Sequence, residues 1–506
     1  MKILSSTNIL LLAIGMTVLL FVLDFVFYGS GISGDTPEYL SLAGDVYNLK
    51  FPHSPLYLPG FPMLIGFTAK LISIKMYQAA QIWMGLFYGI NIVYLYKLVN
   101  YLHKIKATSK LGSYFLFFVM ISWWSFRIQK ATHADAMYFS LLIVLTVFTM
   151  KSFLENKANY FFGVGIVLAI MAITKYNAFI LISIIGLLIV LADFEFKLKI
   201  KYILISILPS VGSIMIWKFL NGGFIYALNA SNYEKSSFSF LDVLNSMVTN
   251  TTNFGKTVVE LLINPIVGRY INSISGLIIG TIVILFFIFL VFKYRKSKLE
   301  FIFITFAFIY LISVIFIQSI NLVSEINIRT LLTFNFFMFL LIGLKIQSYK
   351  NKIAAVSFFC ILLLNNFLIS YKWITQTSKG NSFKYEYATQ NEVFFKDNLF
   401  LKSIKNKEVM SNVSEQLLFH INYQQHVQTF KTDRLFYKGK FEELKDDDLK
   451  KITKDLKTCI EKEGVIVFSN SESSNDKLIL KELSTNKYCF NTINNLIIIS
   501  KSKLDL

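Results

Sequence analysis

Long apolar runs, separated by short polar junctions, fill the first three quarters of the sequence. A helix needs about 20 apolar residues to cross a hydrocarbon core about 30 Å thick. The pattern therefore predicts a mostly α-helical, polytopic membrane bundle of about 11 spans over residues 1–375. The expected spans are 8–28, 78–100, 111–127, 136–153, 160–174, 177–192, 202–220, 271–292, 300–320, 328–345 and 353–372.

Basic residues at the junctions predict how these spans are oriented. Lysine and arginine follow every second run, as at Lys104, Lys151 and Lys197, whereas the opposite loops are longer and carry fewer of them. Because cytoplasmic loops retain basic residues, the N-terminus is expected in the cytoplasm. The first run is longer than the apolar core of a signal peptide and is read as a retained helix. The C-terminal region is then expected outside the membrane.

The composition supports a membrane protein and argues against a nucleic-acid partner. Hydrophobic residues make up 55% of the 506 residues and charged ones 16%, with a mean hydropathy of +0.55. The net charge is +19, but residues 375–506 carry 21 basic and 18 acidic groups, so the excess lies in the short loops of the bundle. Lys-, Ile- and Asn-rich usage suggests an AT-rich bacterial genome, which makes the bacterial inner membrane the expected location.

The last part of the chain, residues 376–506, changes character. Residues 441–461 have the pattern of an amphipathic helix, 414–421 that of a short helix, and 464–468 and 496–499 are β-branched runs. A small extracytoplasmic α/β domain is expected here. Three cysteines are too few for a disulfide scaffold, although Cys459 and Cys489 could pair outside the cytoplasm.

Two long outer loops are expected, at 29–77 and 221–270, and the first is the more informative. Thr36 before Pro37 predicts a helix start. An apolar stripe through Leu40, Ala43 and Val46 favours a helix lying flat at the membrane surface. Asp35 stands just before this helix, where backbone N–H groups favour an anion. Asp35 could carry chemistry, or Asp35 or Thr36 could simply cap the helix.

Further ionisable residues stand at the outer ends of later spans. Arg127, Lys130, His133 and Asp135 gather at one boundary, where plain snorkelling to the surface is the alternative to a functional role. Lys175 and Arg329 are expected on the outer side of the membrane, although basic loop residues are usually cytoplasmic. Phosphate binding is a natural role for such cations, and an interfacial anchor is the alternative.

Several short motifs together resemble the membrane-embedded glycosyltransferases of the GT-C superfamily. They are Asp35 after the first span, a Tyr39-containing amphipathic helix, and residues 57–62 (Tyr-Leu-Pro-Gly-Phe-Pro). Similar elements continue at 131–139 (Ala-Thr-His-Ala-Asp-Ala-Met-Tyr-Phe), 173–176 (Ile-Thr-Lys-Tyr) and 327–329 (Asn-Ile-Arg). The nearest relatives in this resemblance are bacterial counterparts of protein O-mannosyltransferases and of the lipid A aminoarabinose transferase. Asp135 stands where a Glu is more usual, and Thr36 replaces an acidic residue.

This resemblance implies a reaction and a set of site residues. A sugar would pass from a polyprenyl-phosphate donor to an acceptor hydroxyl at the outer face of the membrane, with inversion, and the acceptor would be a glycan, lipid or protein. Membrane lipids would be the other partners. Asp35 is the expected base, and Asp135 is the second expected catalytic residue. The expected substrate-binding residues are Glu38, Tyr39, His53, Tyr57, Arg127, Lys130, His133, Lys175, Tyr176 and Arg329.

No cofactor is expected, and other function classes remain open. His133 and Asp135 are two residues apart, so on a helix they face different directions, and no metal-ligand spacing such as HExxH occurs. A divalent metal is therefore a weak alternative. A transporter or flippase of a lipid-linked glycan would also need many spans, but would place charges near the bilayer midplane. A non-catalytic envelope assembly protein would be indifferent to the loss of Asp35.

Overall fold

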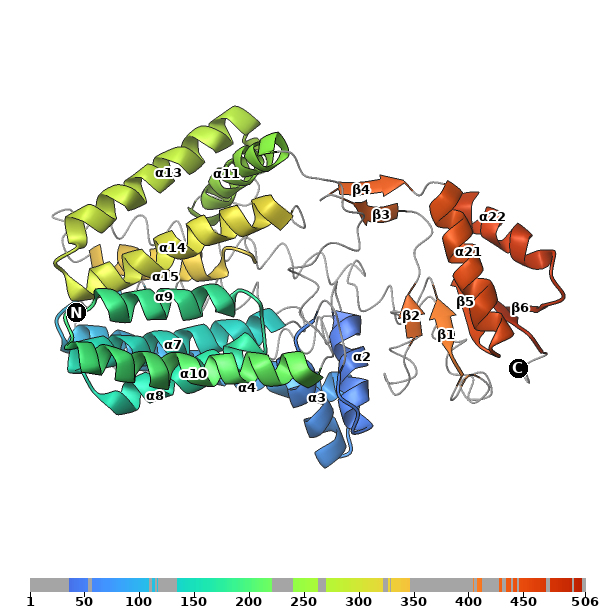
Figure 1. The fold of residues 1–506 in the computed structure, drawn as a ribbon, viewed down its shortest axis with the longest axis horizontal. Helices are drawn as coiled ribbons and strands as arrows, with labels where there is room; N and C mark the ends of the chain where they lie inside the picture. The colour runs from blue at the N-terminus through green and yellow to red at the C-terminus, as the bar shows by residue number, and fades with distance from the viewer. Residues whose placement is uncertain are drawn as a thin grey trace, which may run out of the picture. The chain divides into compact units, whose positions relative to one another are not determined.

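The computed structural model shows a bundle of long helices followed by a small mixed sheet (Figure 1). It describes residues 36–52, 57–108, 112–113, 116, 134–220, 240–262, 270–321, 326–327, 329–345, 404, 407–411, 427–429, 434–437, 440–443, 446–469, 474–493 and 496–502. Within them, one compact unit holds the bundle. A second holds residues 36–52, 62–80 and the C-terminal region. The predicted spans 8–28 and 353–372, most of 111–127, and the expected helix 414–421 lie outside the described residues.

Helices of the bundle coincide with the predicted apolar runs. Among the described helices, five are long and apolar enough to cross a membrane, namely α4 (Met76–Lys104), α7 (Ala134–Glu155), α10 (Phe196–Leu220), α13 (Ser273–Tyr294) and α14 (Lys298–Asn321). Shorter apolar helices are α8 (Ala158–Ala172), α9 (Ala178–Leu191) and α15 (Leu332–Lys345). Residues 221–270, expected as a long outer loop, contain a helix, α11 (Phe240–Leu262).

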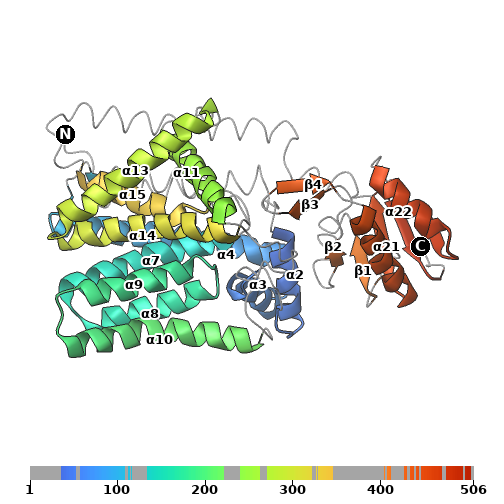
Figure 2. The same cartoon turned by 45° about the horizontal axis from the view of Figure 1, so that its top comes forward.

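Helix α7 is the most enclosed of the five long helices. Within its most apolar stretch 78% of the residues are buried, against 17% in α10 and in α13. It packs against α8, α14 and α15, and α8 in turn packs against α9 and α10. Both views show α7, α8, α9 and α10 running side by side (Figures 1 and 2). The outward faces of α10 and α13 carry exposed Ile, Leu and Phe side chains, as expected of surfaces that meet lipid.

Glycines allow α11 and α13 to approach each other closely. A Cβ on Gly255 of α11 would lie 2.7 Å from the Gly280 nitrogen of α13, and a Cβ on Gly276 would lie 2.9 Å from the Thr252 carbonyl oxygen. Small residues let two helix backbones come into close van der Waals contact, which a larger side chain at the same position would prevent. The Gly276-x-x-x-Gly280 spacing of α13 therefore matches its packing role.

The first outer loop contains two short helices, α2 (Thr36–Tyr47) and α3 (Gly60–Leu71). The stripe of Leu40, Ala43 and Val46 is buried, and Gly66 of α3 comes into contact with Ala43 and Val46. Other residues of the protein therefore cover this stripe, and the position of the helix at the membrane surface stays a prediction.

The C-terminal region contains a five-stranded sheet with the order β2-β1-β5-β7-β6. β1 (Val409–Ser411) pairs in parallel with β2 (Val427–Thr429) and β5 (Val465–Ser469), and β7 (Leu496–Ser500) is antiparallel to β5 and to β6 (Cys489–Ile493). β3 (Arg434–Tyr437) and β4 (Lys440–Glu443) form a separate hairpin. The helix expected at 441–461 begins later than predicted, as α21 (Asp446–Glu461), because its first residues belong to β4.

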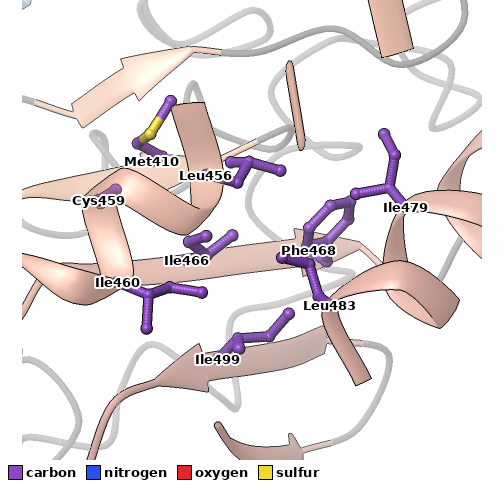
Figure 3. Packing of buried hydrophobic residues seen from close by; sticks show 9 residues of the cluster. All are labelled: Met410, Leu456, Cys459, Ile460, Ile466, Phe468, Ile479, Leu483 and Ile499. Atoms are coloured by element: carbon purple, nitrogen blue, oxygen red, sulfur yellow. The ribbon is translucent and has the colours of Figure 1, made fainter. Parts of the chain in front are cut away.

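Helices α21 and α22 (Ser474–Ser484) cover one face of this sheet. Ile466 and Phe468 alternate along β5 and so reach the same face. Figure 3 shows them among the side chains of the two helices. The core consists of Met410, Leu456, Cys459, Ile460, Ile466, Phe468, Ile479, Leu483 and Ile499.

The pairing of Cys459 with Cys489 that the sequence allowed is absent, since both thiols are free. Cys459 is 2% exposed on α21, whereas Cys489 is half-buried on β6. Burial, strengthened by the neighbouring Glu408 charge, raises the pKa of the Cys459 thiol to about 12. Its thiolate is therefore scarce at neutral pH.

We expect N-ethylmaleimide at pH 8 to modify Cys489 but not Cys459 in the folded protein with Cys360→Ser. The thiolate is the nucleophile, and a raised pKa lowers its fraction at any given pH. Unfolding returns the Cys459 pKa to about 8.5, so both residues should then react. Peptide mass spectrometry measures the labelling, and equal labelling of both thiols in the native state would contradict the described core.

Gly255→Val should loosen the contact between α11 and α13, at a cost of about 1–3 kcal/mol or more for overpacking. Gly212→Val is the matched control, because nothing lies within 4 Å of a Cβ at Gly212 on α10. Thermal unfolding of the detergent-extracted protein should show a lower midpoint for Gly255→Val alone. Equal midpoints would argue against the close approach.

Candidate functional site

Asp135, in the first turn of α7, is a buried carboxylate held between two cations. It is 3% exposed. One carboxylate oxygen accepts a hydrogen bond from the Lys175 ammonium, and the other accepts one from Arg329 Nε at 2.6 Å. These partners are 40 and 194 residues away along the sequence. The cluster thus joins three distant segments of the bundle.

Each cation comes from a turn at the end of a helix. Lys175 lies between α8 and α9, where its N–H bonds the Met171 carbonyl at 3.0 Å and its carbonyl accepts from Ala178 N–H at 3.0 Å. Arg329 precedes α15. The Asn327 side chain accepts hydrogen bonds from the backbone N–H groups of Arg329 at 2.9 Å and Thr330 at 3.1 Å. This Asx turn fixes the backbone that presents Arg329.

Among the described residues, the cluster of Asp135, Lys175 and Arg329 holds two positive charges and one negative charge, and its cations are the more exposed members. The side chains of Lys175 and Arg329 are 22% and 51% exposed, against 4% for Asp135. A carboxylate so buried is stabilised only by paired cations. Because both of its oxygens already accept hydrogen bonds, Asp135 is suited to orienting the two cations. It is poorly suited to accepting a proton from a substrate.

Beneath the cluster, aromatic and hydroxyl groups support Lys175. Its ammonium lies 5.7 Å from the centroid of the Tyr138 ring, within the range of a cation–π contact. The Tyr138 hydroxyl is hydrogen-bonded to the Thr333 hydroxyl at 2.8 Å. Tyr138 is fully buried, so α7 and α15 are joined directly behind the charged groups.

The first-loop turn reaches the same place. Gly60 N–H donates to the Ile173 carbonyl at 2.7 Å, and a Cβ at Gly60 would lie 2.9 Å from the Thr174 hydroxyl oxygen. Gly60 therefore contacts the turn that carries Lys175 directly. The glycine of this motif is required because a side chain would collide with the backbone of that turn.

The structure brings together three of the sequence-predicted site residues, Asp135, Lys175 and Arg329. Tyr176 follows Lys175, but its hydroxyl is buried without a hydrogen-bond partner, and its ring meets Phe179 at 6.1 Å. Burial raises the pKa of Tyr176, so it stays protonated at physiological pH. Tyr57 is half-buried next to the docked turn, and Tyr39 is buried on α2, in the other compact unit.

The remaining predicted site residues cannot be compared with this geometry. Those that lie outside the described residues are Asp35, His53, Arg127, Lys130 and His133, together with the Glu38 side chain. Within the part of the chain that the structure describes, no group of three or more His, Cys, Asp or Glu side chains could hold a metal. The expected independence of a metal stays a prediction.

Tyr138 and Asn327, which support the cluster, lie within the motifs of the resemblance but were not predicted as site residues. Tyr138 stands three positions after Asp135, one helical turn further along the same face, and Asn327 stands two positions before Arg329, the spacing of an Asx turn. Both spacings were visible in the sequence. Their importance emerges only once Asp135 is known to be paired.

Comparison with known proteins places the fold. No family model matches the sequence, and no curated protein matches it. A structure of ArnT from Cupriavidus metallidurans bound to undecaprenyl phosphate is similar, with a TM-score of 0.56 and 11% identity over 98% of this chain and 99% of that one. The Archaeoglobus fulgidus oligosaccharyltransferase tethered with an acceptor peptide is also similar, with a TM-score of 0.51 and 11% identity over 98% of this chain and 74% of that one.

Both neighbours are GT-C glycosyltransferases. The predicted resemblance to this superfamily is therefore confirmed at the level of the fold. Together with the five long apolar helices, this fold identifies an integral membrane protein.

Asp135→Asn should destabilise the protein, because it removes the carboxylate that both Lys175 and Arg329 contact. We expect a loss of about 2 kcal/mol, below the roughly 3–5 kcal/mol of a fully buried pair, since both cations are partly exposed. Thermal unfolding in detergent measures this change. Asp447→Asn, at a surface carboxylate that is 96% exposed beside Lys450, is the control and should have little effect.

The effects of Asp135 and Lys175 on stability should also depend on each other. Lys175→Met is expected to cost less stability in the Asp135→Asn background than in the wild type, because the lone cation it removes is then unfavourable. Equal costs in both backgrounds would show that the ion pair is not formed.

Proposed function

We propose that this protein is a membrane glycosyltransferase that moves a sugar from a polyprenyl-phosphate donor to an acceptor hydroxyl at the outer face, with inversion. The observation that carries the proposal is the pair of cations, Lys175 and Arg329, held together on one buried carboxylate within a GT-C fold. A neighbour with this fold, ArnT, was solved with undecaprenyl phosphate bound.

The cations suit the phosphate side of the reaction. As the bond between the anomeric carbon and the phosphate oxygen breaks, that oxygen keeps the electron pair and negative charge develops on the phosphate. Donors and cations held in place before the reaction stabilise such charge most effectively. Among these three described residues, one negative charge on Asp135 stands against the two positive charges of Lys175 and Arg329.

The acceptor side requires a different carboxylate. The acceptor oxygen attacks the anomeric carbon opposite the departing phosphate, which inverts the configuration, and its proton must pass to a base. Asp135 is occupied by its two cations, so we assign it a positioning role. Asp35 remains the proposed base, on the strength of the resemblance to the GT-C superfamily.

The surrounding assignments follow from this division. We propose that Tyr57, next to the Gly60 contact with Ile173, binds substrate, and the resemblance to the GT-C superfamily extends this proposal to the first-loop residues Glu38, Tyr39 and His53. The reaction as proposed needs no metal. The proposed setting is the bacterial inner membrane, with a cytoplasmic N-terminus and an extracytoplasmic C-terminal region, which the distribution of basic loop residues supports.

Sugar transfer in membranes, with a panel of radiolabelled polyprenyl-phosphate sugars and with or without EDTA, tests the proposal. We expect wild-type transfer, a loss of at least about 100-fold for Asp35→Asn, and a loss of at least about tenfold for Lys175→Met and for Arg329→Met. Lys157→Met is the matched control, since Lys157 pairs with Glu155 at a surface site and is 59% exposed. It should leave transfer unchanged.

Expression and size distribution in detergent are matched among these variants. Full transfer by Lys175→Met and Arg329→Met would remove the cations from the reaction. No transfer from any donor by well-folded wild type would contradict the enzyme and favour a transporter or flippase of a lipid-linked glycan.

A further inference from the structure

The two turns that carry the cations are joined a second time, directly behind the charged groups and next to the Tyr138 and Thr333 hydroxyls. Tyr310 on α14 places its hydroxyl between them. This hydroxyl accepts a hydrogen bond from the Asn177 side-chain amide at 2.7 Å and donates one to the Thr330 carbonyl at 2.9 Å. Tyr310 is 0% exposed, so water cannot replace either bond without a rearrangement of the core.

Both partners of Tyr310 are close in sequence to a cation. Asn177 is in the same turn as Lys175, two residues further on, and Thr330 directly follows Arg329. Asp135 joins the tips of the two cationic side chains. Tyr310 joins the backbone segments that carry those side chains. The separation of Lys175 and Arg329 is therefore fixed both at the charged groups and at the backbone.

The support for Tyr310 is rigid. Helix α14 packs against α7, α9 and α15, the helices next to the cluster. The Asx turn at Asn327 shapes the backbone that leads to the Thr330 carbonyl. Two like charges repel each other, and a phosphate gains most from cations already held in the orientation it needs, because little ordering remains to be done on binding.

We propose that Tyr310 is a positioning residue, which holds the Lys175 turn and the Arg329 segment at the separation that binds the phosphate of a lipid-linked donor. This inference rests on the proposed function. Tyr310→Phe keeps the buried ring and removes both hydrogen bonds, leaving the Asn177 amide and the Thr330 carbonyl without their partner. The two segments can then shift relative to each other, and the affinity for the phosphate falls.

Tyr202 offers a matched control for the same substitution. It lies on α10, is 3% exposed, and its hydroxyl donates to the Asn156 side-chain oxygen at 3.0 Å. Tyr202→Phe therefore also removes a buried hydroxyl bonded to an asparagine in the same bundle. This bond lies at the junction of α7 and α8, at the C-terminal end of α7, whereas Asp135 lies at its N-terminal end.

The test measures binding of undecaprenyl phosphate to the full-length protein in lipid nanodiscs. We expect the dissociation constant to rise about tenfold for Tyr310→Phe, equivalent to about 1.4 kcal/mol, and to change less than about twofold for Tyr202→Phe. In an Arg329→Met background, Tyr310→Phe should have little further effect, because it acts through the placement of Arg329. Asn177→Ala, which removes one of the two hydrogen bonds, should also weaken binding of undecaprenyl phosphate. This variant replaces Tyr310→Phe in the test if Tyr310→Phe does not fold.

Different failures have different meanings in this design. Wild type that does not bind, or Lys175→Met that binds as well as wild type, would overturn the proposed phosphate site and this inference with it. Binding that depends on Lys175 but is unchanged in Tyr310→Phe and in Asn177→Ala would overturn the inference alone. An equal loss for Tyr310→Phe with and without Arg329 would also overturn it, because it would show that Tyr310 does not act through that residue.

Discussion

Burial of one carboxylate, Asp135, is the constraint on which the site depends. A buried charge is costly unless cations and hydrogen bonds compensate it, and here two cations do so from segments 40 and 194 residues away. The most enclosed of the five long helices, α7, carries this charge at its N-terminal end. The buried position of the N-terminal end of α7 therefore depends on both cations being in place.

Close backbone contacts make this assembly possible in a membrane. Helices in lipid gain nothing from the hydrophobic effect when they meet, so packing contacts decide their arrangement. Gly255 and Gly280 bring α11 against α13, and Gly60 brings the first-loop turn against the turn that holds Lys175. Because Gly60 has no side chain, the first-loop turn can approach the backbone at Ile173 closely. The same contact supports the turn that carries Lys175.

The arrangement of charge separates two roles that a short motif does not distinguish. A carboxylate at a span end can act as a base or can orient other groups. The buried Asp135, with both oxygens occupied, belongs to the second kind, and its partners Lys175 and Arg329 carry the exposed positive charge. The proposed chemistry then divides between cations that receive the phosphate and a separate carboxylate that takes the acceptor proton.

Local patterns in the sequence determined the elements, whereas tertiary structure decided their partners. The apolar run 136–153 becomes α7 at Ala134–Glu155, and the run 464–468 becomes β5 at Val465–Ser469, because hydropathy and side-chain alternation are properties of neighbouring residues. Lys175 and Arg329 could be singled out because they oppose the topological charge bias. Their shared attachment to Asp135 could not be read from the sequence.

Two features that the sequence left undecided have the same origin. A stripe such as Leu40, Ala43 and Val46 shows that one face of a helix is buried, but not whether lipid or protein buries it. The polar segment 221–270 does not reveal that much of it forms α11 against α13. Periodicity and hydropathy are set within a few residues of each position. Which charge neutralises which, and which face covers which, depends on how distant segments pack, and that is decided by the folded chain as a whole.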